Sequence, residues 1–170
     1  MSHDRKRIGP VVVVALLVTM APTVAVAQMF VPMGRATLRE LPGLEIEVEA
    51  DQALEAAGVT AGVLRATVAE RLRAGGVPVY PSQQANPGAT RPFVYVLVTP
   101  LALPAGGHAV ALQVQVRQAL RSPVTASEVV DAVTWGRQSL VFVPPGPLTA
   151  LLPEVEAMVS GLVADWQAVH

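Results

Sequence analysis

The sequence predicts an α+β fold, in which a mixed β-sheet carries both of its helices on one face as a two-layer sandwich. Three observations predict it. Apolar and charged residues alternate strictly over residues 44–50 (LEIEVEA), which is typical of a half-buried strand. Apolar residues recur at helical spacing in 61–72 and in 155–169. Valine-rich segments fill 93–143 between these helices, so the predicted order is β-α-β-β-β-α.

The first unit is predicted to be a strand, a helix and a second strand. Thr60 is a suitable N-cap for the helix, and Gly75-Gly76 is expected to end it. Residues 77–80 (VPVY) form the next short strand, whose proline favours a sheet edge or a strand start. Such a unit is expected to pair its two strands in parallel through a right-handed crossover.

The next strands are predicted to form an antiparallel meander. The first is apolar on both faces, which indicates a central or covered position, whereas the second alternates Val110, Leu112, Val114 and Val116 with polar residues. The predicted segments are 93–103, 108–121, 129–136 and 140–143, of which the last extends or follows its predecessor.

A long loop and a closing helix complete the predicted elements. Residues 81–92 (PSQQANPGATRP) carry turn-forming residues throughout and separate the first unit from the meander. After PPGP at 144–147, the apolar stripe of the closing helix is expected to start around 152–154, because Pro153 is tolerated only near a helix start.

The N-terminus has the features of a cleavable secretory signal. Arg5, Lys6 and Arg7 precede an apolar run at 11–21, and Ala25-Val26-Ala27 supplies small residues before Gln28. An uncleaved membrane anchor is the alternative, which the shortness of the run disfavours. We therefore expect 1–27 to be removed after Ala27 and the mature chain to be periplasmic or secreted.

The remaining chain is expected to hold one domain. Residues 28–43 are predicted to be a linker or a docking arm, and residues 44–170 a single α+β domain. The sequence contains no cysteine, so it has no disulfide and no site for lipid attachment, and we expect no stable membrane anchor after cleavage.

Charge limits the partners of the mature chain. The chain has 12 basic and 13 acidic residues, and three basic residues and one acidic residue precede Gln28. Nine arginines therefore face twelve acidic residues, a formal net charge of −3. A weakly acidic domain is a poor candidate for nucleic-acid binding or for electrostatic docking on anionic lipid.

The candidate binding face combines outward residues of two strands with one tryptophan. The expected residues are Glu45, Glu47, Glu49, Gln113, Gln115, Arg117 and Trp135. The glutamates are suited to a cation site or to acid–base chemistry, but a solvated strand face compensated by Arg117 explains them more simply. Trp135 is suited to the core or to stacking on a sugar or a peptide.

The sequence lacks the residue patterns of a metal site, a serine nucleophile and a phosphate-binding loop. His108 is the one histidine inside the predicted domain away from its end, so we expect no metal site, and no serine lies in a G-x-S-x-G elbow. Neither Gly75-Gly76 nor Gly106-Gly107 opens a helix, as a phosphate cradle requires. We therefore expect no catalytic residue and no cofactor.

The motifs taken together resemble small exported bacterial proteins without an assigned activity. The resemblance covers about residues 38–169 and rests on LEIEVEA, LRAGGVPVY, the valine-rich meander and VTW before the closing helix. It implies an envelope location and a compact α+β module, and carries over no site residues. A similar order of elements occurs in periplasmic accessory domains that bind partner proteins.

Three functions are compatible with these features. The first is a non-enzymatic exported module that binds another envelope component, for which we expect a protein, and in which alanine at Gln115 and Arg117 weakens binding. An edge strand, such as 77–80, is also suited to pairing with a strand of the partner. The alternatives are a small hydrolase or glycan-binding protein that acts on an envelope polymer, and a self-associating structural protein.

Overall fold

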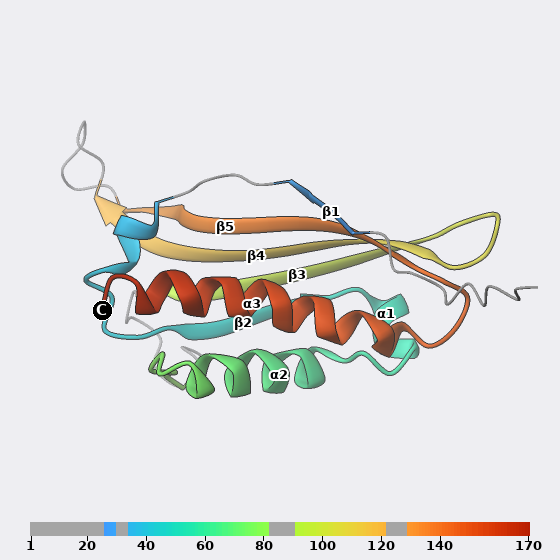
Figure 1. Cartoon of the computed structure of the whole chain (residues 1–170), viewed down its shortest axis with the longest axis horizontal. Helices are drawn as coiled ribbons and strands as arrows, with labels where there is room; N and C mark the ends of the chain where they lie inside the picture. The colour runs from blue at the N-terminus through green and yellow to red at the C-terminus, as the bar shows by residue number, and fades with distance from the viewer. Residues whose placement is uncertain (1–25, 30–33, 82–90, 122–128) are drawn as a thin grey trace, which may run out of the picture.

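A five-stranded mixed sheet forms the centre of the fold (Figure 1). The computed structural model describes residues 26–29, 34–81, 91–121 and 129–170. The sheet order is β1-β5-β4-β3-β2, in which only β2 and β3 pair in parallel. The predicted α+β class is therefore confirmed. The strands are β1 (Val26–Met29), β2 (Glu45–Ala50), β3 (Phe93–Ala102), β4 (His108–Arg121) and β5 (Val129–Val143).

Two helices connect β2 to β3. The short helix α1 (Gln52–Ala56), which was not predicted, is capped by the Asp51 carboxylate. The longer helix α2 (Ala61–Ala74) begins at Thr60 as predicted, because the Thr60 hydroxyl accepts a hydrogen bond from a backbone N–H of the first turn. The left-handed backbone of Gly76, with φ of +78°, follows the end of the helix.

The predicted strand at 77–80 requires a correction. It is a single parallel bridge between Leu44 and Val79, in which the Leu44 N–H donates to Pro78 O and the Tyr80 N–H donates to Leu44 O, each at 2.9 Å. Pro78 has no N–H with which to continue a ladder. The strand that pairs with β2 in parallel over its full length is therefore β3, and 77–80 borders β2 on its other side.

The C-terminal half consists of β5, a 3-10 turn and the closing helix. β5 is continuous and joins the predicted segments 129–136 and 140–143. A 3-10 turn, η3 (Leu148–Leu151), leads into α3 (Leu152–Gln167), whose first turn contains Pro153 as expected. None of the helices in the described ranges is long and apolar enough to cross a lipid bilayer.

Part of the predicted arm at 28–43 docks on the domain. The 3-10 turn η1 (Arg35–Leu38) contacts β5 and α3, and Leu38 is fully buried. The predicted cleavage point lies within β1, between Ala27 and Gln28. Residues 1–25 and most of the predicted loop, 82–90, lie outside the described residues.

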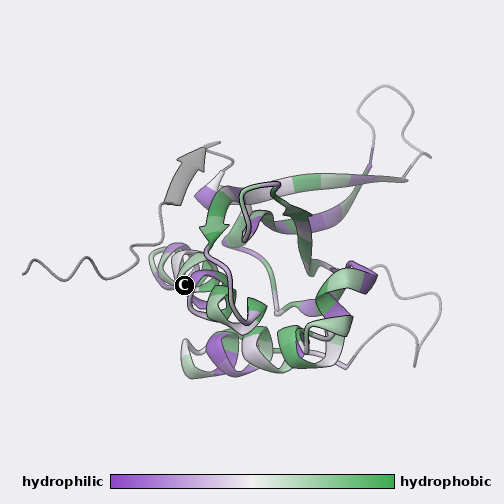
Figure 2. Ribbon diagram, turned by 90° about the vertical axis from the view of Figure 1, so that its right-hand side faces the viewer, coloured by the Kyte–Doolittle hydropathy of each residue, from purple (hydrophilic) through white to green (hydrophobic). Residues whose placement is uncertain are grey.

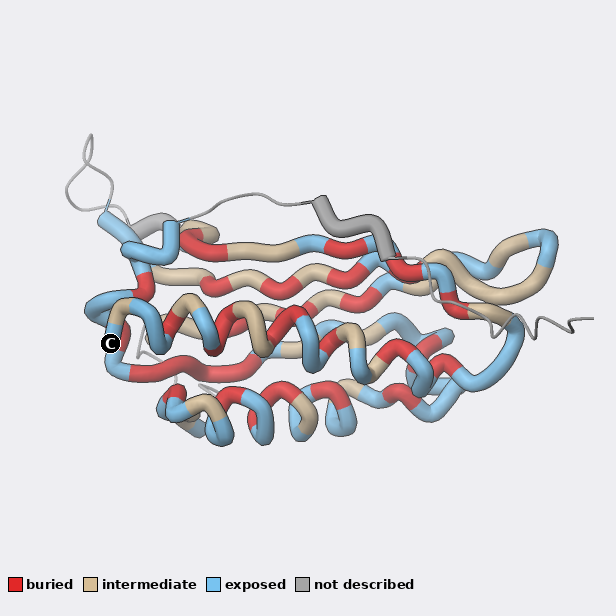
Figure 3. Tube along the Cα trace, in the orientation of Figure 1, coloured by how far each residue is buried: buried red, intermediate tan, exposed pale blue. Residues whose placement is uncertain are grey.

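The core lies between the sheet and the helices α2 and α3, which run side by side on one side of the sheet (Figures 1 and 2). Buried positions alternate along the central strands, as Figure 3 shows. The sheet contributes Val94, Val96, Val98, Val110, Leu112, Val114 and Val116. The helices contribute the predicted stripes Leu64, Val68 and Leu72, and Val155, Val159, Leu162 and Trp166.

Gly75 permits the close approach of α2 to α3. A Cβ at Gly75 would lie 2.2 Å from Cγ1 of Val163, a buried β-branched side chain with little freedom to move. We expect Gly75→Ala to lower the free energy of unfolding by about 1–3 kcal/mol through overpacking. Urea denaturation followed by circular dichroism measures this change.

Gly62 provides the matched control on the same helix. A Cβ at Gly62 would meet only Thr60 Oγ1, at 3.6 Å, so Gly62→Ala should stabilise the protein by about 0.5 kcal/mol through helix propensity. Equal effects of Gly62→Ala and Gly75→Ala would show that the contact between Gly75 and Val163 does not limit the packing of the two helices.

Candidate binding face of the sheet

The face of the sheet turned away from α2 and α3, here called the open face, presents alternate residues of four strands. Its cross-strand rows are Glu47–Tyr95–Gln115, Glu49–Leu97–Gln113–Gln138 and Thr99–Ala111–Leu140. The structure thus brings together five of the seven predicted site residues: Glu47, Glu49, Gln113, Gln115 and Arg117. The sequence also placed the other two, Glu45 and Trp135, on this face.

One half of the open face is polar, and its charges are paired across strands. The Tyr95 hydroxyl donates a hydrogen bond to the Glu49 carboxylate. The Arg117 guanidinium lies 5.4 Å from the centre of the Tyr95 ring and 3.4 Å from the Asp131 carboxylate. Glu49 is therefore partnered by Tyr95, whereas Arg117, which was expected to compensate the glutamates, is partnered by Asp131 and the Tyr95 ring.

This pairing fixes the protonation state of Tyr95. The hydrogen bond to Glu49 raises the pKa of the phenol most, burial and the Glu49 charge raise it further, and the Arg117 charge lowers it in part. The phenol is therefore a hydrogen-bond donor at neutral pH. This half of the face presents a fixed polar surface.

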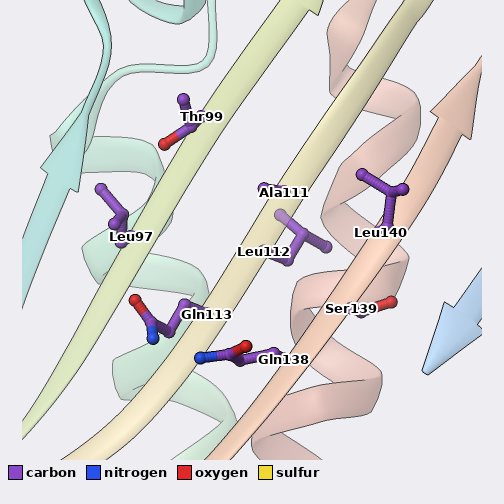
Figure 4. A pocket seen from close by; sticks show the side chains of 8 residues that line it. All are labelled: Leu97, Thr99, Ala111, Leu112, Gln113, Gln138, Ser139 and Leu140. Atoms are coloured by element: carbon purple, nitrogen blue, oxygen red, sulfur yellow. The ribbon is translucent and has the colours of Figure 1, made fainter. Parts of the chain in front are cut away.

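The other half of the open face is apolar and hollowed (Figure 4). A groove of about 470 Å³ lies over β4, within the range of about 300–1,000 Å³ typical of ligand sites. Ala111 has the smallest side chain of its row and forms the floor between Thr99 on β3 and Leu140 on β5. The lining residues are Leu97, Thr99, Ala111, Leu112, Gln113, Gln138, Ser139 and Leu140.

Large apolar side chains near the groove are exposed. Leu101 is 65% exposed, Leu140 53% and Phe142 38%. Leu101 and Phe142 both pair with Ala109, in the row next to the one that contains Leu140. The three exposed side chains therefore lie together at the apolar end of the open face. The apolar end of the open face therefore presents large apolar side chains to solvent.

Glu45 does not belong to the exposed surface, although it follows the alternation of β2. Its side chain is 2% exposed, and its carboxylate lies 3.9 Å from the guanidinium of Arg91. Arg91 in turn lies over the ring of Tyr80, at 4.9 Å from the ring centre. Glu45 therefore belongs to the end of the sheet near the bridge at Val79, and its place on the binding face is corrected.

Trp135 does not lie on the open face either, because β5 contains a bulge. Val116 pairs with Trp135 whereas Arg117 pairs with Val133, so Thr134 is an extra residue in β5. The bulge turns Trp135 toward the helices, where it is 2% exposed. The core position weighed for Trp135 is therefore confirmed, and its place in the candidate binding face is corrected.

Trp135 instead anchors a charged cluster between the sheet and α3. Its indole N–H donates to Asp165 Oδ2 at 3.1 Å. The Asp165 carboxylate also accepts a hydrogen bond from Arg35 Nε at 2.8 Å and lies 3.5 Å from Arg137 Nη2. The Asp165 side chain is 14% exposed, so the cluster ties η1, β5 and α3 together in a largely buried place.

The cluster holds Asp165 in its ionised form. Burial raises the pKa of the Asp165 carboxyl, but the hydrogen bonds from Trp135 and Arg35 and the charges of Arg35 and Arg137 lower it by more. The net pKa lies below the ordinary value of an aspartate. Asp165 is therefore a structural anion at neutral pH.

Sequence reasoning missed the apolar half of the open face. Residues 93–103 are apolar at nearly every position, which indicated a central or covered strand; β3 is central, but its outward face is not covered by a helix. The signal that was present is the alternation in β4, where Ala109 and Ala111 occupy the outward positions between valines and leucines. Small residues on a strand between two strands with larger outward side chains leave a groove.

The described residues include no group of three or more histidine, cysteine, aspartate or glutamate side chains that could hold a metal ion. Comparison of the chain with family models, curated proteins and solved structures finds no match.

Proposed function

We propose that the chain is an exported, non-enzymatic module that binds a protein of the cell envelope through the open face of its sheet. The observation that carries this proposal is the apolar groove over Ala111, beside the exposed side chains of Leu101, Leu140 and Phe142. In a two-layer sandwich, the helices cover one face of the sheet and leave the other for a partner.

The export part of the proposal rests on the N-terminal sequence. The basic start, the apolar run at 11–21 and the small residues at Ala25 and Ala27 have the order of a secretory signal. Their removal leaves a chain that begins just before the docked turn η1.

The chemistry of the open face favours a protein over a glycan. The surface of the groove is mainly apolar, and its polar lining residues are the amides Gln113 and Gln138 and the hydroxyl residues Thr99 and Ser139. Trp135, the residue weighed for stacking on a sugar, is buried and cannot serve such a ligand. Among the glutamates weighed for hydrolysis, Glu49 is bonded to Tyr95 and Glu45 lies beside Arg91.

Photo-crosslinking in the producing cell tests the proposal. A p-benzoylphenylalanine placed at Thr99, which is exposed on the open face, should give a discrete protein adduct. The matched control places the same residue at Ala66, which is exposed on α2 on the opposite side of the molecule. We expect no adduct from Ala66.

The outcomes separate the alternatives. The same adducts from Thr99 and Ala66, or none from Thr99, would contradict binding through the open face. A polydisperse glycan adduct at Thr99 would favour the glycan-binding alternative. Mass spectrometry of the N-terminal peptide from the same cells tests cleavage before Gln28.

A further inference from the structure

The outer edge of β5 is occupied by a strand that processing would cut. β1 pairs antiparallel with β5, and Ala27 lies opposite Leu140 while Gln28 lies opposite Ser139. The cleavage expected after Ala27 therefore falls in the middle of β1. Only Gln28 and Met29 would remain of this strand, as the free end of the chain, and free ends seldom hold a strand in place.

Removal of β1 would leave backbone groups of β5 without partners. β4 covers the inner edge of β5 along its whole length, but β1 pairs with the outer edge only at residues 138–141. Unpaired N–H and C=O groups on an edge strand are a template for pairing with another chain.

Ser139, in the middle of this edge, provides a second observation. Its side chain is 6% exposed, and its hydroxyl has no hydrogen-bond partner within the part of the chain that the structure describes. Buried polar atoms are rarely left unpaired. Figure 4 shows the Ser139 hydroxyl on the side of β5 that faces β1, whereas Gln138 and Leu140 lie toward β4. A strand that replaces β1 can offer a polar side chain here.

We propose that the outer edge of β5 at residues 138–141, which β1 occupies in the full-length chain, is a docking site for an extended strand of the partner protein. The proposal rests on the proposed function and names how the partner is held. The occupant is an extended segment because β1 itself pairs there through its backbone, in antiparallel register.

The residues along the edge also predict which side chains the docked strand should carry. A strand next to β5 places alternate side chains beside Leu140 on the open face, where Leu140 and Phe142 are exposed. Apolar residues at these positions would extend the apolar half of the open face. The intervening residues would lie beside Ser139. The docked strand would therefore continue the groove surface already proposed for the partner.

Disulfide trapping with a peptide tests the docking site. The protein is purified from the cell envelope after natural processing and carries Leu140→Cys, in a chain that otherwise has no cysteine. The probe is a synthetic peptide with the sequence of residues 23–31 and a cysteine at the position of Ala27. Leu140 faces Ala27 in β1, so the two thiols should meet when the peptide takes the place of β1.

Register and position controls make the result specific. The same peptide with its cysteine at the position of Gln28 should react at least about tenfold more slowly, because a shift of one residue turns the thiol to the other face. With the control protein Leu101→Cys, which is exposed on β3 away from this edge, the two peptides should react equally.

Three results would overturn the proposal. Equal rates of both peptides with Leu140→Cys would exclude strand pairing, and preferential dimerisation through Leu140→Cys would assign the edge to a second copy of the chain. An intact N-terminus before Val26 would show that β1 is retained. In each case the crosslinks from Thr99 still test binding through the open face independently.

Discussion

Asp165→Ala is expected to lower the free energy of unfolding by about 2–4 kcal/mol, because it removes the acceptor of the buried Trp135 indole N–H and the ion pair with Arg137. The Trp135 indole N–H and the Arg137 guanidinium both face the Asp165 carboxylate between β5 and α3. Arg35 is 61% exposed, so its lost contact adds little to this cost. Urea denaturation followed by circular dichroism measures the change.

Glu156→Ala is the matched control for this prediction. Glu156 lies on the same helix α3 but is exposed, so its removal should change stability by less than about 0.5 kcal/mol. If Asp165→Ala and Glu156→Ala had equal effects, the cluster around Asp165 would not hold α3 on the sheet.

The Asp165 cluster also predicts how stability depends on pH. The folded pKa of Asp165 lies below the ordinary value, so its contribution is complete above about pH 4, the pKa of an unfolded aspartate. The contribution is lost as the pH falls through the folded pKa. Asp165→Asn removes the charge, so the stability difference between wild type and Asp165→Asn should shrink below about pH 4. A constant difference would contradict this role of the charge.

The elements built from local signals could be predicted from the sequence. The Thr60 cap, the glycines after α2 and the stripe of α3 each depend on residues that are neighbours in the chain, and the structure confirms them. The sequence predicted a strand at 77–80, but the structure has a single bridge there, because Pro78 has no N–H with which to extend the ladder.

The sequence left open whether Trp135 lies in the core or on the binding face, because the direction of its side chain depends on a bulge held by distant residues. Thr134, the extra residue, accepts a hydrogen bond from the Thr37 hydroxyl at its backbone oxygen and another from the Gln118 amide at its hydroxyl. Alternation along β5 alone would place Trp135 on the same face as Val133, which is opposite to the observed face.

The cluster at Asp165 was out of reach of sequence patterns for a similar reason. Its members come from η1, β5 and α3, and no spacing in the sequence links Arg35 to Asp165. In the open face, by contrast, five predicted residues were placed together, because alternation within β2 and β4 is regular there.

Ala111→Trp is expected to reduce partner binding at least about tenfold, a loss of about 1.4 kcal/mol or more, because the indole fills the groove. Ala111 is exposed at the groove floor, between Thr99 and Leu140, so the larger side chain can point away from the core and the fold should be retained. The measurement is the yield of the adduct from p-benzoylphenylalanine at Thr99, with circular dichroism to verify folding.

Two comparisons make this prediction specific to the apolar half of the open face. Ala66→Trp introduces the same side chain on exposed α2 and should leave the adduct unchanged. Gln115→Ala and Arg117→Ala, in the polar half, should weaken binding less than Ala111→Trp, because Arg117 is already engaged by Asp131 and Tyr95. A full adduct yield with Ala111→Trp, together with a loss with Gln115→Ala, would move the binding site to the polar half that the sequence first suggested.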